Sequence, residues 1–314
     1  MTIENVTLTD PKTGSRASIL AGFGFNCYEF VANINGREVD VVWSAPDFAS
    51  GNERASGSGI PLLFPFPGRL RGTVFHWEGR DYQLESGDGR GNAIHGFILN
   101  RAWRVIEQSG TRVVGQFQAS EDDPTILEQW PADFRVTATY ELSGNRLAST
   151  FLFENPDDKP LPCGFGTHPY FRLPLGGSSG ESCLVTIPAT EHWELVDMLP
   201  TGECRALEAA AAYQRGLRFG DMTFDDVFGG LVFSGGECTS QIIDPSSNTQ
   251  LSMCFDGSFR ELVVYTPPHR GAVCVEPYTC VPGTVGLDMP GVDFGLRVLQ
   301  PGKSFTSRVN LEVS

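Results

Sequence analysis

The chain has 314 residues, and 38 acidic against 23 basic side chains give it a formal net charge of −15. This charge argues against nucleic acid or an anionic membrane as a partner, because both repel an acidic protein. A neutral or cationic small ligand fits better.

No segment has the ~20 apolar residues that a membrane-spanning helix needs, and residues 1–14 lack the apolar run of a signal peptide. We therefore expect a cytoplasmic protein. β-Rich folds often reach this length as one unit, so we predict one domain over residues 1–314. The eight cysteines are too dilute and irregular for a disulfide framework and should be mostly reduced and buried.

Hairpins are predicted from the N-terminal part onward. Residues 28–34 and 37–43 flank Asn35-Gly36, the dipeptide best suited to a type I′ turn. Residues 73–77 and 81–84 flank a glycine and form a second candidate pair. Each pair predicts two antiparallel strands.

The clearest strand signal lies in the middle of the chain. Apolar residues alternate with polar ones over residues 134–142 and again over residues 146–154, with a Ser-Gly-Asn turn between them. This predicts a half-buried hairpin. Further strands are expected at residues 240–243, 250–255, 261–265, 271–275 and 304–311.

Two segments depart from the strand pattern. Apolar residues at helical spacing predict a short helix over residues 122–130, whereas the alanine-rich residues 205–215 stay unassigned. With so many short antiparallel strands and so little helix, the sheet must cover its apolar face with a second sheet. We predict an all-β fold, a large antiparallel β-sandwich with little helix.

His168 is the first candidate site residue. Pro169 restricts it to an extended backbone, and Gly164 and Gly166 allow a ligand or neighbouring backbone to approach closely. The alternative is a buried histidine that satisfies a local carbonyl. Glu276 is the second candidate, because it ends a strongly apolar strand, and a charge at such a position often faces a cleft.

Weaker signals come from three loops or strand ends. Arg69 lies in a bend of prolines and glycines suited to holding ligand oxygens, and the alternative is an ordinary surface arginine. His95 stands beside a glycine. Asp225 and Asp226 lie between phenylalanines, where they either serve a ligand or cap backbone N–H groups. Neither histidine has the partner spacing of a zinc site, so no metal is predicted.

Taken in order, these stretches resemble those of the aldose 1-epimerase, or galactose mutarotase-like, proteins. The matching motifs are Phe64-Pro65 with Pro67-Gly68-Arg69, Ile94-His95-Gly96, His168-Pro169-Tyr170-Phe171, Phe224-Asp225-Asp226 and Val275-Glu276-Pro277. The resemblance implies the large β-sandwich called the galactose mutarotase-like supersandwich, with no metal or organic cofactor. It covers nearly the whole chain.

The resemblance also implies roles for single residues. Glu276 would be the general base and His168 the general acid in ring opening and reclosure of a free aldose. Acidic neighbours are expected to keep His168 protonated near neutral pH. Substrate hydroxyls would be bound by Arg69, His95 and Asp225, and Tyr170 would supply an apolar wall for the sugar ring.

The sequence departs from the galactose-specific pattern at Gly68, Thr167 and Asp226, where the family often has asparagine, asparagine and histidine. The sugar is therefore left open, as are its phosphorylation and a monomeric or homodimeric state. Three alternatives remain: a carbohydrate-binding or regulatory module without turnover, a hexose-6-phosphate mutarotase using Arg69, Arg71 and Arg101, and a sugar hydrolase or lyase using Asp225 and Glu276.

Overall fold

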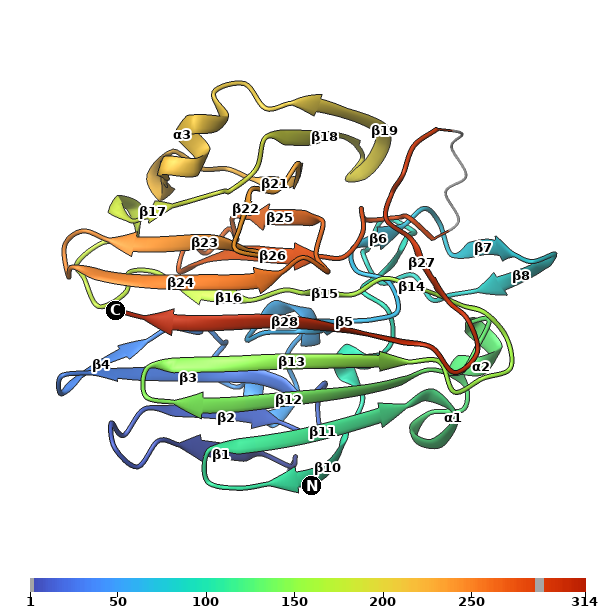
Figure 1. Cartoon of the computed structure of the whole chain (residues 1–314), viewed down its shortest axis with the longest axis horizontal. Helices are drawn as coiled ribbons and strands as arrows, with labels where there is room; N and C mark the ends of the chain where they lie inside the picture. Colours follow the sequence, from blue (N-terminus) through green and yellow to red (C-terminus); the bar gives the residue numbers. More distant parts are fainter. Residues whose placement is uncertain (1–2, 286–290) are drawn as a thin grey trace.

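The computed structural model describes residues 3–285 and 291–314 and confirms an all-β sandwich of antiparallel sheets (Figure 1). Its helices are short: α1 (Ala119–Asp122), α2 (Ile126–Gln129) and α3 (Ala210–Arg215). Five 3₁₀ turns complete the described helical structure, at Phe48–Ser50, Ala55–Gly57, Ile98–Asn100, Gly180–Ser182 and Phe219–Asp221.

The larger sheet forms one layer of the sandwich and contains ten strands. Nine of them, in spatial order, are β10 (Arg104–Gln108), β11 (Arg112–Gln118), β12 (Arg135–Ser143), β13 (Arg146–Glu154), β28 (Ser304–Val313), β24 (Thr249–Asp256), β23 (Glu237–Asp244), β17 (Leu184–Val185) and β20 (Leu217–Arg218). The tenth, β22 (Phe233–Ser234), pairs with β23. Figure 1 shows β28, from the end of the chain, lying between β13 and β24.

The predicted central hairpin is confirmed as β12 and β13. Their ladder runs from Ser143 opposite Arg146 to Arg135 opposite Glu154. Along β12, buried residues alternate with half-buried or exposed ones. One face of this sheet therefore covers the core, and the other meets solvent.

The second sheet has eight strands and carries the candidate site. They are β19 (Leu199–Ala206), β18 (Glu191–Val196), β21 (Asp225–Gly229), β25 (Glu261–Tyr265), β26 (Ala272–Tyr278), β15 (Gly166–Thr167) and β5 (Leu62–Leu63) in spatial order, with β16 (Tyr170–Arg172) also paired to β26. All seven residues of β26 are buried. Val273 and Val275 face the main core, so the intervening side chains lie on the opposite face.

Smaller sheets complete the described strands. They are the four-stranded sheet of β1 (Val6–Thr9), β2 (Arg16–Leu20), β3 (Asn26–Ile34) and β4 (Arg37–Asp40), and the pairs β6 (Arg69–Leu70) with β9 (Ala93–Ile94), β7 (Val74–Trp77) with β8 (Arg80–Gln83), and β14 (Leu161–Cys163) with β27 (Arg297–Leu299). The predicted hairpins at β3–β4 and β7–β8 are confirmed. Asn35 and Gly36 have φ values of 54° and 86°, as a type I′ turn requires.

Several predicted boundaries are wrong by up to three residues, and Glu276, expected at the end of its strand, lies inside β26, which continues to Tyr278. β4 ends at Asp40 instead of residue 43, because Val42 forms a bridge with Phe171 and the chain there joins the second sheet. The helix predicted over residues 122–130 is broken between α1 and α2. Pro124 disfavours helical geometry at the preceding residue, and Asp123 accordingly has φ −153° and ψ 82°. The unassigned residues 205–215 contain the end of β19 and then α3.

Aromatic side chains join the two large sheets. Phe153 of β13 packs against Phe165, just before β15, with ring centroids 4.5 Å apart, and against Phe64, just after β5, at 4.8 Å. All three are fully buried. This contact anchors the strands that carry the site to the regular sheet.

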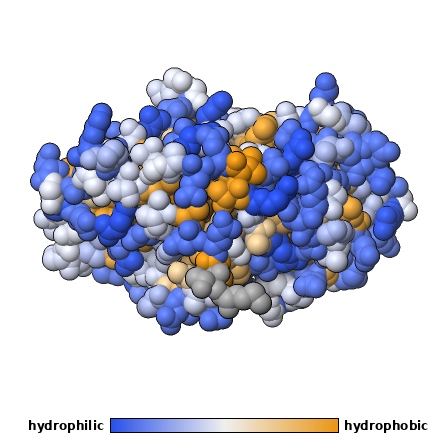
Figure 2. Space-filling model, turned by 90° about the horizontal axis from the view of Figure 1, so that it is seen from below, coloured by the Kyte–Doolittle hydropathy of each residue, from blue (hydrophilic) through white to orange (hydrophobic). Residues whose placement is uncertain are grey.

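The cysteines are mostly buried and unpaired, as the sequence predicts, and the face shown in Figure 2 is mainly hydrophilic. All eight cysteines are free, and six are buried; Cys204 is exposed and Cys254 half-buried. Figure 2 shows one face of the molecule, on which hydrophilic side chains predominate around a small central apolar area. No helix in the described ranges is long and apolar enough to span a membrane.

Candidate active site

Strand register brings the two main candidate residues together. Tyr170 of β16 lies opposite Cys274 of β26. Counting two residues back on one strand and two forward on the other places His168 opposite Glu276. Pro169 lacks an N–H group and interrupts the hydrogen-bonded ladder between them, while the His168 N–H donates to the Pro61 carbonyl on the other side. Residues far apart in sequence thus become neighbours.

The same face continues over the next two strands. Tyr265 of β25 lies opposite Cys274, and Asp225 of β21 lies opposite Tyr265. Side chains two residues apart on a strand share a face, so Glu276 points to the same side of the sheet as Cys274. The sheet therefore presents a row of polar and aromatic side chains on a face that the main core does not cover.

Arg69 and His95 come from the small sheet of β6 and β9. Arg69 lies opposite Ile94, and His95 follows directly with φ 68°. The His95 N–H donates to the Gly68 carbonyl, and the Gly68 N–H donates to His95 Nδ1 over 3.2 Å. Because Nδ1 accepts this bond, the neutral His95 ring carries its proton on Nε2 and can donate it to a ligand.

One hollow of about 170 Å³ collects these side chains. All six residues that the sequence singled out line it: Arg69, His95, His168, Tyr170, Asp225 and Glu276. Sequence reasoning missed further lining residues, among them Arg54, Ser56, Leu195, Met198, Tyr265 and Tyr278. Tyr278 could have been found from the sequence, because it stands two residues after Glu276 and so shares its face of the strand. No sequence motif marks the other missed residues.

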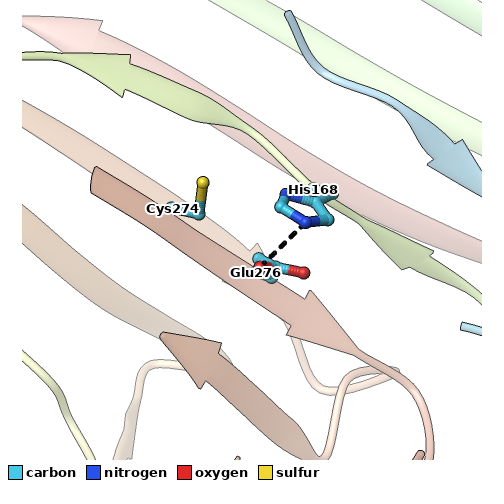
Figure 3. Close-up of side chains that lie close together, drawn as sticks. All are labelled: His168, Cys274 and Glu276. Carbon is cyan, nitrogen blue, oxygen red and sulfur yellow. Dashed lines mark ion pairs between the residues drawn. The ribbon is translucent and has the colours of Figure 1, made fainter. Parts of the chain in front are cut away.

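His168 and Glu276 form a close, buried pair. His168 Nε2 lies 3.3 Å from Glu276 Oε1, and the residues are 7% and 1% exposed; Figure 3 marks this contact with a dashed line. The Tyr278 hydroxyl donates a 2.7 Å hydrogen bond to Glu276 Oε2. The His168 ring stacks on Tyr170, with centroids 4.9 Å apart. Aromatic neighbours thus fix the orientation of both groups.

Burial sets the protonation of this pair. It lowers the pKa of His168 to about 3, and the nearby positive charges of Arg54 and Arg69 act in the same direction. Burial also raises the pKa of Glu276 well above its usual value, although the hydrogen bond from Tyr278 opposes this. Burial therefore favours a neutral His168 and a protonated Glu276, contrary to the expectation that acidic neighbours keep His168 protonated.

The two aspartates of β21 point to different places. Asp225 lines the hollow with the pair, and burial raises its pKa. Asp226 Oδ1 instead lies 3.4 Å from His192 Nε2 and lines a neighbouring hollow. Arg69 forms an ion pair with Asp88, with Arg69 Nε 3.4 Å from Asp88 Oδ2.

A third ligand-type side chain lies beside the pair. The nearest donor atoms of His168, Cys274 and Glu276 all lie within 4.8 Å of one another, and all three residues are buried (Figure 3). Sequence spacing gave no sign of this group, because the register of β16 and β26 creates it.

The comparisons with known proteins agree on one family. A model of the aldose 1-epimerase family matches residues 6–312. The uncharacterized protein YihR of Escherichia coli (strain K12) is 23% identical over 247 residues, which cover 77% of this chain and 75% of that protein.

Solved structures share the fold along the whole chain. A galactose mutarotase-like protein from Clostridium acetobutylicum matches with a TM-score of 0.88 at 22% identity, covering 99% of this chain and 95% of that one. Galactose 1-epimerase from Lactobacillus acidophilus NCFM matches with a TM-score of 0.72 at 18% identity, covering 99% of each chain.

Proposed function

Because the chain belongs to the aldose 1-epimerase family, we propose that it interconverts the α and β anomers of a free aldose. The observation that carries this proposal is the buried pair of His168 and Glu276, 3.3 Å apart in the wall of a small hollow. Anomer exchange needs one group to take the O1 proton and another to protonate the ring oxygen. Both oxygens are bonded to C1, so the two groups must be close neighbours.

In the proposed mechanism, Glu276 takes the proton from O1 and His168 gives one to the ring oxygen. The bond between C1 and the ring oxygen breaks, C1 turns about its bond to C2, and the ring closes on the other face. Because burial favours the proton on Glu276, the proposed mechanism passes it to His168 across the 3.3 Å contact before ring opening. The pair holds one proton throughout and exchanges roles on ring closure.

The other lining residues would bind the sugar. Asp225 can accept hydrogen bonds from hydroxyl groups, while Arg69 and His95 Nε2 can donate them. Tyr170 would offer an apolar surface to the ring. The hollow of about 170 Å³ is smaller than the roughly 300–1,000 Å³ of sites for drug-sized ligands and suits a single monosaccharide ring.

The phosphorylated-sugar alternative has less support. Arg101 Nε lies 2.7 Å from Asp123 Oδ2, and Arg101 lines a separate hollow, different from those of the pair and of Asp226. Arg69 is already paired with Asp88. A phosphate would also have to approach a protein of net charge −15.

Polarimetry with a panel of freshly dissolved sugars tests the proposal. The enzyme should speed the approach to the equilibrium rotation of at least one free aldose. Binding of several sugars without acceleration of any would favour a carbohydrate-binding module. Release of monosaccharides from oligosaccharides would favour the hydrolase.

A further inference from the structure

Cys274 is a buried thiol directly beside the proton-transfer pair. It stands two residues before Glu276 on β26, so the two side chains share a face, and its Sγ lies within 4.8 Å of the donor atoms of both partners. Cys274 does not itself line the hollow, whereas His168 and Glu276 do. The proposed mechanism of anomer exchange does not use the Cys274 thiol.

The three donors suit one kind of ion. Imidazole, thiolate and carboxylate together favour Zn²⁺, whereas Mg²⁺ and Ca²⁺ prefer oxygen ligands only. Two ligands at about 2.0 Å from a tetrahedral ion lie about 3.3 Å apart, which is the separation of His168 Nε2 and Glu276 Oε1. The Cys274 thiol would need to move by on the order of 1 Å to complete the site.

The pair also has polar atoms that lack partners. Glu276 Oε1 and His168 Nδ1 are both buried without a hydrogen-bond partner among the described residues. An unsatisfied buried oxygen is costly, and a cation would satisfy it. His168 and Glu276 both line the hollow, so an ion entering it meets the pair, and a water molecule in the hollow would serve as the fourth ligand.

We propose that His168, Cys274 and Glu276 form an inhibitory zinc site at the proton-transfer pair. The ion replaces protons on the carboxyl and thiol groups, and its charge compensates both anions in the buried site. Zinc bound here occupies the lone pairs that Glu276 and His168 need for proton transfer. The protein would work without metal and stop when zinc binds.

The test measures metal binding and turnover separately. Co²⁺, used as a spectroscopic probe for Zn²⁺, should give a near-ultraviolet thiolate-to-metal absorption band with one equivalent bound, and added Zn²⁺ should abolish the band. Polarimetry should show loss of anomer exchange over the same range of Zn²⁺ and recovery after a chelator is added.

Cys274→Ser and Cys274→Ala provide the decisive variants, and Cys204→Ser is the matched control because Cys204 is the exposed cysteine. The first two should keep the metal-free rate, lose the Co²⁺ band and need about 10- to 100-fold more Zn²⁺ for half inhibition. The control should behave like the wild type. Far-ultraviolet circular dichroism checks that each variant is folded.

The outcomes separate this proposal from the proposed function. The inhibition experiment rests on that function, but the Co²⁺ band does not, so a protein without turnover can still show the site. Absence of the band, or its loss only in Cys204→Ser, would overturn the zinc site. Unchanged zinc sensitivity in both Cys274 variants would place any inhibitory ion elsewhere.

Discussion

The hairpin of β12 and β13 and the strand pair of β25 and β26 are both antiparallel, but they bury their residues differently. In β12, buried and more exposed residues alternate, since one face meets solvent. In β26, all seven residues are buried. Val273 and Val275 belong to the main core, and the opposite face carries Cys274, Glu276 and Tyr278.

The difference in burial between β12 and β26 distinguishes the site from the rest of the sandwich. A polar residue on the solvent face of β12 keeps its hydration and needs no explanation. A carboxyl group in β26 loses its hydration, and only Tyr278 donates to it within the described structure. Such burial lowers stability, so a functional role is the better account of Glu276.

Substitution of either member of the His168–Glu276 pair should have the largest effect on turnover. Glu276→Gln cannot accept the O1 proton, and His168→Asn cannot protonate the ring oxygen. Each should lower the anomer exchange rate by roughly 10² to 10⁴, the usual contribution of a positioned proton transfer. Polarimetry on the best sugar measures the rate, while calorimetry should show that sugar still binds. A near-normal rate in Glu276→Gln would contradict the catalytic assignment.

A substitution in the core under the regular sheet should instead lower stability and leave the site intact. Phe153→Ala removes the ring that packs between Phe64 and Phe165 and should lower the free energy of unfolding by about 3–5 kcal/mol. Chemical denaturation measures this loss. The rate per folded molecule should change little, because Phe153 does not line the hollow. A loss of rate at full folding would mean that this contact also positions the site.

The same contrast explains how much the sequence predicted. Alternation revealed the β12–β13 hairpin, because one face of that sheet meets solvent. It failed in β26, where continuous burial hides the period, and the end of that strand could be located only as an apolar run. Apolar spacing over residues 122–130 predicts one helix and does not show the break at Pro124 between α1 and α2.

For the site, single residues were predictable and their surroundings were not. The family resemblance picked out six residues that the structure brings to one hollow. Arg54 and Met198 reach that hollow from separate segments without a motif. The protonation of His168 was misjudged because acidic residues are visible in a sequence, whereas burial, which dominates the pKa of His168, depends on the assembled sheet.

A smaller effect is expected at the edge of the hollow. Asp225→Asn should weaken sugar binding by roughly 1–3 kcal/mol, the usual value for a hydrogen bond to a charged group, with less effect on turnover. Asp226→Asn is the matched control, since Asp226 faces His192 instead. Titration calorimetry compares the two variants. A collapse of turnover with unchanged affinity would make Asp225 a chemical group and favour the hydrolase.

The smallest effect concerns a second buried carboxyl group of the same sheet. Glu261 of β25 accepts a 2.9 Å hydrogen bond from Trp193 Nε1, and burial raises its pKa from 4.5 to about 7. Between these values the folded state keeps a proton that the unfolded state releases. Stability from this group is therefore fully present below about pH 4.5 and is lost as the pH rises through about 7.

Glu261→Gln cannot ionise, so the variant should be more stable than the wild type by roughly 1–2 kcal/mol above pH 7 and equal to it near pH 4. Denaturation at several pH values gives the difference between the two curves, in which the contributions of all other groups cancel. Glu312→Gln, on the solvent face of β28, is the control and should give a flat difference. A flat difference for Glu261→Gln as well would show that β25 is hydrated there, and the contrast between the two sheets would then hold for β26 alone.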